Sequence, residues 1–141
     1  MKPYRVILDT NILVSGLKST EGASFKLLTL LGSEQIQISI SVPLLLEYED
    51  VLKRERIELN YTAEEVNDFL DYICTISDKR KIFYLWRPFL KDLKDDLVLE
   101  VAVASQSKYI ITSNKRDFTG VEQFGLKALT PKIFLEKLGE I

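Results

Sequence analysis

The sequence of 141 residues has no histidine and a single cysteine, Cys74. The lack of histidine excludes Ser-His-Asp and Cys-His catalysis, imidazole acting as general acid or base, and histidine-ligated zinc. A lone cysteine cannot form an internal disulfide or a thiolate cluster for a metal. Any catalytic chemistry therefore depends on carboxylates, amides, hydroxyls, lysine or arginine, with or without a metal ion held by oxygen.

Long apolar runs and a strong excess of one charge are also absent. Asp9 and Asn11 interrupt the first apolar stretch, Val6–Val14, and no run approaches the ~20 residues of a membrane-spanning helix. The net charge of −2 gives no overall nucleic-acid signal, although it is compatible with a local basic patch. We expect a cytoplasmic protein in which residues 1–141 form a single domain.

Short apolar strands alternate with helical stretches along the chain. Strands are expected at Tyr4–Leu8, Ile36–Ile40, Lys81–Trp86, Tyr109–Thr112 and Leu126–Leu129. Helices are expected at Gly22–Leu31, Ser41–Leu52, Ala63–Ile76 behind a capping box that begins at Thr62, Asp95–Ser105, and from Thr130 to Gly139.

This alternation predicts an α/β protein, a three-layer α/β/α sandwich around a central, mostly parallel sheet of four to five strands. In such sheets a ligand binds beyond the carboxyl ends of the strands. Functional side chains are therefore expected just after strands, or in the first turn of a helix that starts at the same end of the sheet.

Four acidic residues meet this condition. Asp9 is the first residue after the first strand, Glu47 lies early in the helix after the second, Asp96 heads the helix before the fourth, and Asp117 follows the fourth. Each one alone has an ordinary use as a turn residue, a helix cap or a solvated charge. Together they are expected to repel one another unless a divalent cation neutralises them, and clustered oxygen ligands favour Mg²⁺ or Mn²⁺. Such a site can activate water against a phosphodiester.

Five stretches of the chain, in order and at this spacing, resemble the PIN domain family of metal-dependent ribonucleases, and the branch that they resemble is that of VapC-type toxins of toxin–antitoxin pairs. These stretches are Val6–Ser15, Ser41–Tyr48, Asp92–Ala102, Tyr109–Phe118 and Leu129–Leu135. The resemblance covers nearly the whole chain. It implies a PIN-like fold, RNA as substrate, an antitoxin protein as partner and frequent homodimers.

The resemblance also implies roles for individual residues. The carboxylates carried over as catalytic metal ligands are Asp9, Glu47, Asp96 and Asp117. The residues carried over as supporting polar groups are Asn11, Asp92, Asp95, Thr112 and Asn114. The cofactor implied is Mg²⁺ or Mn²⁺.

The fourth stretch departs from much of this branch, which has Gly-Asp where this chain has Ser113 and Asn114. Two alternatives stay open: Asp117, three residues on, supplies the acid, or Asn114 orients a ligand or a metal-bound water. In the third stretch, Asp92 and Asp95 are further alternatives to Asp96, either as ligands or as its supporting partners.

Basic residues near the expected crevice are candidates for contacts with substrate phosphates. Lys115 and Arg116 adjoin the fourth acid and are the preferred candidates, and Lys91 and Lys94 lie in the loop before the third. The denser run Lys79–Lys81 precedes the expected third strand, so it is predicted to lie at the opposite, amino-terminal end of the sheet as a solvated turn.

Two other functions stay open. Asn114 in place of an acid is compatible with a degenerate, non-catalytic PIN-like module that binds RNA or a protein. A phosphotransfer domain with Asp9 as nucleophile is less favoured, because Asn11 stands where an Asp-x-Asp pair would supply a general acid.

Overall fold

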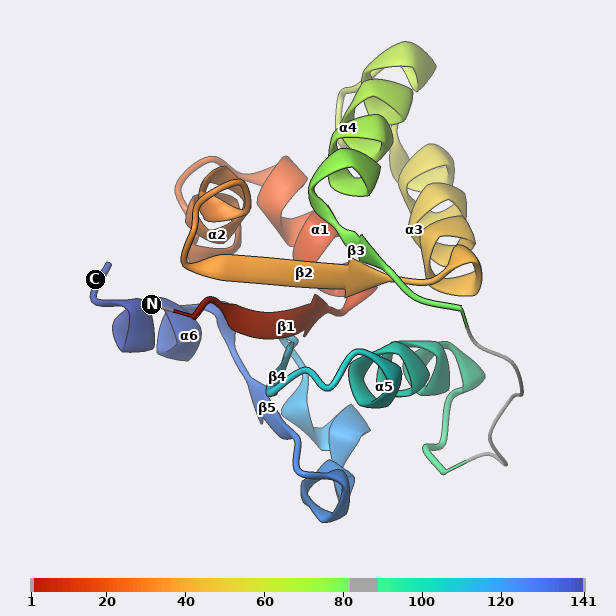
Figure 1. The fold of residues 1–141 in the computed structure, drawn as a ribbon. Coiled ribbons are helices and arrows are strands. Elements are labelled where there is room, and N and C mark those ends of the chain that lie inside the picture. The colour runs from red at the N-terminus through yellow and green to blue at the C-terminus, as the bar shows by residue number, and fades with distance from the viewer. Residues whose placement is uncertain (1, 82–88, 141) are drawn as a thin grey trace.

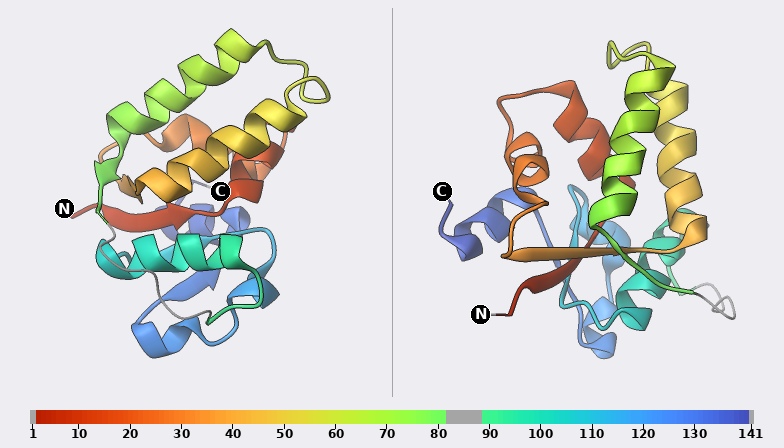
Figure 2. Two further views of the ribbon diagram at one scale, coloured as in Figure 1. Left: turned by 90° about the vertical axis from the view of Figure 1, so that its right-hand side faces the viewer. Right: turned by 45° about the horizontal axis from the view of Figure 1, so that its top comes forward.

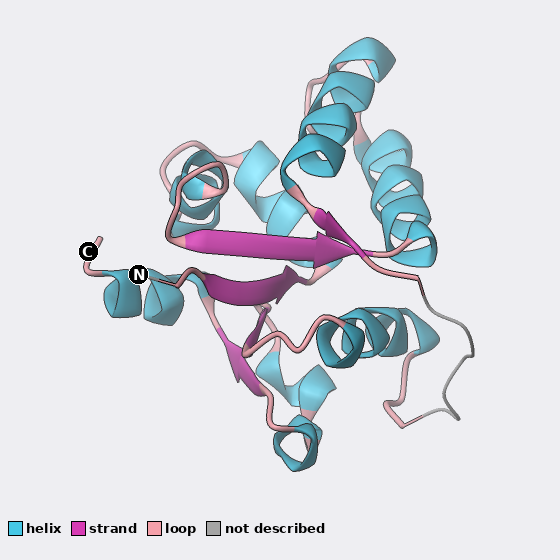
Figure 3. Ribbon diagram, in the orientation of Figure 1, coloured by secondary structure: helices cyan, strands magenta, loops and turns pink. Residues whose placement is uncertain are grey.

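The computed structural model describes residues 2–81 and 89–140. Its centre is a five-stranded sheet in the order β3-β2-β1-β4-β5, and every pairing is parallel. The strands are β1 Tyr4–Leu8, β2 Ile36–Ile40, β3 Asp78–Lys79, β4 Tyr109–Ile111 and β5 Lys127–Leu129. Figure 3 shows these strands surrounded by helices, as the predicted α/β/α class requires.

Helices cover both sides of the sheet. They are α1 Thr10–Lys18, α2 Ala23–Leu30, α3 Val42–Glu55, α4 Ala63–Ile76, α5 Leu93–Ala104 and α6 Pro131–Leu138, with short 3₁₀ turns η1 Lys115–Phe118 and η2 Val121–Phe124. Helices α1 to α4 lie above β1 in Figure 1 and in the left view of Figure 2, and α5 lies below it. The predicted three-layer architecture is therefore confirmed.

Local sequence rules account for several helix ends. In the capping box before α4, the Thr62 hydroxyl accepts from the Glu65 N–H at 3.0 Å and the Glu65 carboxylate accepts from the Thr62 N–H at 2.9 Å. The Ser41 hydroxyl caps α3 by accepting from the Leu44 N–H, and Thr130 caps α6 in the same way. These starts agree with the predicted ones.

Strand β1 is central, because it pairs with β2 on one side and with β4 on the other. Val6 and Ile7 are fully buried and Leu8 is nearly so, as expected for a parallel strand covered on both faces. The segments that follow β1 and β4 consequently leave the sheet side by side at its carboxyl end.

Two elements differ from the prediction. Residues Thr10–Lys18 form helix α1, which the sequence did not predict. The third strand is only Asp78–Lys79, paired with the end of β2. The expected strand Lys81–Trp86 lies outside the described residues from position 82 onward, and Lys81 itself is not in a strand.

The predicted position of the basic run Lys79–Lys81 is wrong. Because Asp78 and Lys79 pair with the last residues of β2, the run lies toward the carboxyl end of the sheet. Its charges are used locally: the ammonium group of Lys79 donates to the Cys74 carbonyl at 2.7 Å, and the guanidinium of Arg80 contacts Asp78 at 2.8 Å.

None of the helices in the described segments combines the length and the apolar character that crossing a membrane requires.

Candidate functional site

Asp9 lies at the carboxyl end of β1 and is 6% exposed. Its carboxylate accepts a hydrogen bond from the Thr112 hydroxyl, which follows β4, at 2.8 Å. Burial raises the pKa of Asp9 above its ordinary value. Hydrogen bonds from Thr112, the Thr10 backbone and Asn11 lower this pKa, whereas the charge of Asp117 raises it. Asp9 is thus a buried carboxylate held in a fixed orientation beside a second one.

The segment after β4 is a chain of hydrogen bonds. The Thr112 hydroxyl also accepts from the Asn114 N–H at 3.0 Å, and the Asn114 side-chain amide donates to Asp117 at 3.1 Å. The Ser113 N–H donates to the Asn11 side-chain oxygen at 3.3 Å, which ties this segment to the start of α1. Asn114 therefore holds the carboxylate of Asp117, as one of the predicted alternatives expects of an orienting residue.

Asp95, in the first turn of α5, is the third carboxylate of this group. Its pKa is raised to about 7, first by burial and then by the neighbouring negative charges, of which Asp9 and Asp117 contribute most. Asp92 and Asp96 add smaller effects in the same direction. Carboxylates from the end of β1, from α5 and from η1 therefore crowd together at the carboxyl end of the sheet.

The side chain of Asp96 turns elsewhere. It is 4% exposed, and its Oδ1 accepts from the Leu90 N–H at 3.0 Å, which fastens the segment before α5 to the helix. Its Oδ2 is buried and accepts no hydrogen bond from any described residue. Asp95 rather than Asp96 thus has the position that the sequence predicts for the acid of the third stretch.

Asp92 has a different use. Its side chain accepts from the Lys94 N–H at 2.9 Å and caps the start of α5, so the structure gives it the role of a helix cap.

Glu47 lies on α3. Its carboxylate contacts the ammonium group of Lys94 at 3.5 Å, and its side chain is only 13% exposed. This ion pair joins α3 to the first turn of α5. Lys94 therefore neutralises Glu47, which the sequence assigns to the metal.

A cavity of about 670 Å³ opens beside these acids. It lies between the segment before α5 and the 3₁₀ turn η1, and it is lined by Phe89, Leu90, Lys91, Asp92, Asp95, Asn114, Arg116, Asp117 and Thr119. Two of the predicted phosphate contacts, Lys91 and Arg116, therefore share a cavity with Asp95 and Asp117. Lys115 is exposed in η1 but does not line this cavity.

Tyr48 is a residue of the site that the sequence analysis missed. It is 2% exposed, and its hydroxyl donates to the Leu8 carbonyl at 2.5 Å, directly before Asp9. Burial and the charge of Asp9 raise the pKa of the Tyr48 phenol well above its ordinary range. The only feature of the sequence that points to a role for Tyr48 in the site is its position on the apolar face of α3, next to Glu47.

The donor set fits a hard divalent cation, since it consists of carboxylate, amide and hydroxyl oxygens. Burial, and after it neighbouring negative charges, raise the pKa values of Asp9 and Asp95, and a bound cation would favour the charged form of both groups. Within residues 2–81 and 89–140, however, no three carboxylates are already close enough to one another to ligate one ion. Metal binding therefore requires side-chain rotation, which the exposed Asp117 and half-buried Asp95 allow.

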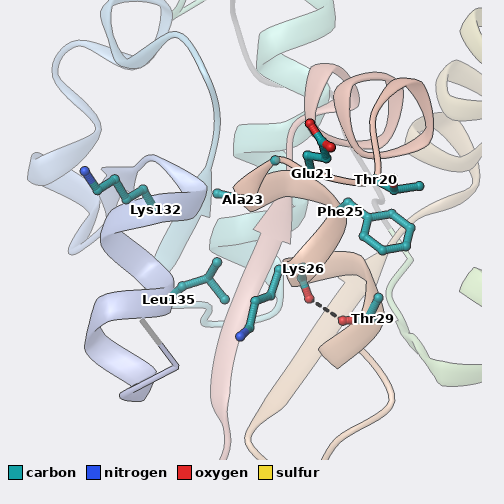
Figure 4. Close-up of a pocket in the computed structure, with 9 residues that line it drawn as sticks. Thr20, Glu21, Ala23, Phe25, Lys26, Thr29, Lys132 and Leu135 are labelled. Atoms are coloured by element: carbon teal, nitrogen blue, oxygen red, sulfur yellow. Dashed lines mark hydrogen bonds between the residues drawn. The ribbon is translucent and has the colours of Figure 1, made fainter.

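Two other hollows lie around α2 and α6. The first, of about 480 Å³, has Lys26 of α2 and Lys132 of α6 on its two sides (Figure 4). The second, of about 590 Å³, shares Lys132 with the first and extends to Ser113. None of the predicted catalytic carboxylates lines either hollow.

Comparisons with known proteins agree with this fold. The family model described as PIN domain matches residues 5–116. Among solved structures, the crystal structure of VapBC2 from Rickettsia felis bound to a DNA fragment from their promoter is similar in fold, with a TM-score of 0.60. The sequence identity is 18%, and the match covers 89% of this chain and 98% of that chain. No curated protein matches the sequence.

Proposed function

The chain belongs to the PIN domain family, and from this premise we propose that it is a metal-dependent endoribonuclease. PIN domains are generally nucleases, which supports hydrolysis of a phosphodiester. The observation that carries the proposal is the crowding of Asp9, Asp95 and Asp117 at the carboxyl end of the sheet, where burial and neighbouring negative charges raise the pKa values of Asp9 and Asp95. RNA as substrate and Mg²⁺ or Mn²⁺ as cofactor come from the family resemblance.

In this proposal Asp9, Asp95 and Asp117 hold the metal, and Glu47 joins them if it leaves Lys94. A divalent ion bound by such carboxylates supplies an activated water and stabilises charge on the phosphate. Thr112 and Asn11 hold the carboxylate of Asp9, and Asn114 holds that of Asp117.

Basic residues of the same cavity bring in the substrate. Arg116 and Lys91 line the cavity next to Asp95, so we assign them contacts with substrate phosphates. Lys115 is assigned a weaker contact, because it is exposed outside the cavity wall.

We also propose that the chain is a single domain, the toxin of a toxin–antitoxin pair, and acts in the cytoplasm. Similarity in fold to VapBC2 supports an antitoxin partner. The family resemblance supports a homodimer.

The test is cleavage of RNA by the purified chain with Mn²⁺ and with EDTA. Asp9→Asn and Asp95→Asn should each lower the rate at least ~100-fold, because each removes a charged ligand. Asp96→Asn is the matched control, since it keeps an oxygen that can accept from Leu90 and should retain most activity.

Two results would contradict the assignment. Cleavage that survives both Asp9→Asn and Asp95→Asn would show that these carboxylates are not the catalytic ones. Loss of cleavage in Asp96→Asn, with full activity in Asp95→Asn, would show that Asp96 is the metal ligand of the third stretch, as the sequence predicts.

A non-catalytic module that binds RNA or a protein is the second candidate, and Asn114 in place of an acid favours it. Calorimetric titration with Mn²⁺ separates the two functions. The endoribonuclease should bind Mn²⁺ and lose that binding in Asp9→Asn, whereas a degenerate module should give no saturable heat.

A further inference from the structure

Phe89 is an aromatic side chain left at the surface beside the candidate site. It precedes α5, is 39% exposed, and lines the cavity of about 670 Å³ that also contains Asp95 and Asp117. Its ring does not belong to the hydrophobic core formed by the described residues. A partly exposed aromatic ring therefore stands in the wall of a cavity whose other lining residues are mostly polar or charged.

The ring of Phe89 has two close neighbours. It makes an edge-to-face contact with Phe124 at 5.1 Å between centroids and 77° between planes. A Cβ atom at Gly120 would lie 3.2 Å from Cζ of Phe89, so glycine, with a φ of +94°, lets the backbone approach the ring. The ring is thus fixed in place by its neighbours while much of its surface stays accessible.

The cavity combines this ring with charges of both signs. Lys91 and Arg116 line it together with Asp95 and Asp117, two of the acids that the proposed function assigns to the metal. We propose that Phe89 is a stacking platform for an unpaired nucleobase of the substrate, an inference that rests on the endoribonuclease function proposed above. The base lies on Phe89, and the adjoining phosphate lies between the cations and the acidic group.

A nucleotide matches all three features of the cavity. Its base is flat and stacks on an aromatic ring whatever its sequence, and its phosphate is the anion that lysine and arginine bind. The volume lies within the ~300–1,000 Å³ of ordinary small-molecule sites. A purely apolar ligand would make no ionic contact with Lys91 and Arg116, and a simple anion would make no stacking contact with Phe89.

The stacking platform has a consequence for substrate choice. A base in a duplex is already stacked and paired, so it cannot lie on Phe89 without being extruded. Single-stranded RNA, or an unpaired loop, should therefore bind and be cleaved in preference to duplex of the same sequence.

The first experiment separates stacking from packing by steady-state cleavage of a single-stranded oligoribonucleotide. Phe89→Leu keeps an apolar side chain without an aromatic face and should raise KM about tenfold. Its kcat should stay within about twofold, because the metal ligands are untouched. Phe89→Trp should restore the low KM. Tyr72→Leu, at an aromatic residue that is 42% exposed on α4, is the matched control and should leave KM unchanged.

The second experiment removes the base instead of the ring. An abasic ribose is placed in turn at each position near the scissile phosphate. At one position the abasic substrate should raise the KM of the wild-type chain as much as Phe89→Leu raises it on the intact substrate. At that same position the abasic substrate should not raise the KM of Phe89→Leu any further. The stacking platform is refuted if the effects of the abasic site and of Phe89→Leu on KM multiply at every position. It is also refuted if Phe89→Leu cleaves like the wild type.

The third experiment distinguishes failure of this inference from failure of the proposed function. Binding of the same oligoribonucleotide, single-stranded or in a duplex, is measured by fluorescence anisotropy in the Asp95→Asn variant, which should not cleave. Adding Phe89→Leu should weaken single-strand binding about tenfold and leave duplex binding unchanged. If the wild type does not cleave RNA but this difference persists, the endoribonuclease proposal fails and the platform stands. Equal binding by both variants, or no binding by either, overturns the platform.

Discussion

At the scale of single residues, the sequence locates the third acid of the site only to within one position. Asp95 and Asp96 are neighbours in α5, and successive helical residues point about 100° apart. Which of them faces Asp9 depends on the rotation of the helix, which the packing of α5 and the contact of Asp96 with Leu90 determine. By contrast, Asp9 and Asp117 follow directly from the rule that sites lie after parallel strands.

Asp95 should make the metal-free chain less stable as the pH rises. Its folded pKa of about 7 lies above the ordinary value of 3.8, so the folded state binds the extra proton between those values. The free energy of unfolding should fall from pH ~4 to pH ~7 and then level off. Urea unfolding in EDTA, at several pH values, measures this.

Asp95→Asn serves as the control for that pH dependence, because asparagine does not titrate. The fall in stability should become clearly shallower in this variant, although Asp9, whose pKa is also raised, leaves a residual slope of the same sign. An unchanged slope would mean that the Asp95 carboxyl is not the titrating group.

At the scale of secondary-structure elements, the sequence predicts a helix boundary where neighbouring residues alone determine it. The capping box at Thr62 and Glu65 forms as predicted, because both of its hydrogen bonds lie within one helical turn. The sequence does not predict helix α1, and the structure shows that Asp9, the residue before it, makes no side-chain capping bond. That carboxylate is bound to Thr112 instead, a contact that no local pattern reveals.

Tyr48 should contribute to stability by fixing α3 to the end of β1. Tyr48→Phe removes the buried hydrogen bond to the Leu8 carbonyl and should lower the free energy of unfolding by about 1–2 kcal/mol. Tyr61→Phe is the matched control, since the Tyr61 hydroxyl contacts the Leu17 carbonyl at 3.3 Å in a half-buried place and should cost less. Chemical denaturation checks both variants, and equal costs would refute the anchoring role.

Close packing of α1 on α2 depends on Gly16. A Cβ at this position would lie 2.3 Å from Cδ1 of Leu28, and the Ser24 backbone is 3.3 Å away. Gly16→Ala should therefore destabilise the chain by about 1–2 kcal/mol, despite the better helix propensity of alanine.

A double-mutant cycle identifies the cause of that loss. In a Leu28→Ala background the clash is gone, so Gly16→Ala should cost much less there. The same cost in both backgrounds, by thermal or urea unfolding, would show that the loss does not come from Leu28.

At the scale of the whole molecule, the alternation of strands and helices predicted a parallel sheet, and the position of its carboxyl end followed from that. Two things could not be read from the sequence. The short pairing of β3 with the end of β2 depends on tertiary contacts. Because of this pairing, the run Lys79–Lys81 lies at the opposite end of the sheet from the predicted one. The exposure of Phe89 depends on how Gly120 and Phe124 approach it.

Binding of Mn²⁺ should stabilise the molecule as a whole, because the ion binds carboxylates that only the folded sheet assembles. At an ion concentration of about 100 times Kd the gain is about 2.7 kcal/mol, which corresponds to a rise in Tm of roughly 8 °C. Calorimetry with and without Mn²⁺ measures the rise. It should disappear in Asp9→Asn and persist in Asp68→Asn, an exposed aspartate on α4.

The hydrogen bond from Thr112 to Asp9 joins residues that are 103 positions apart. During synthesis, the central strand β1 is made long before its neighbour β4. The edge of β1 that pairs with β4 in the folded chain is therefore unpaired for most of translation. The acidic site cannot assemble until Asp117 has left the ribosome. Nascent chains and fragments that stop short of β4 should therefore be inert towards RNA, and the order of synthesis itself delays the proposed activity.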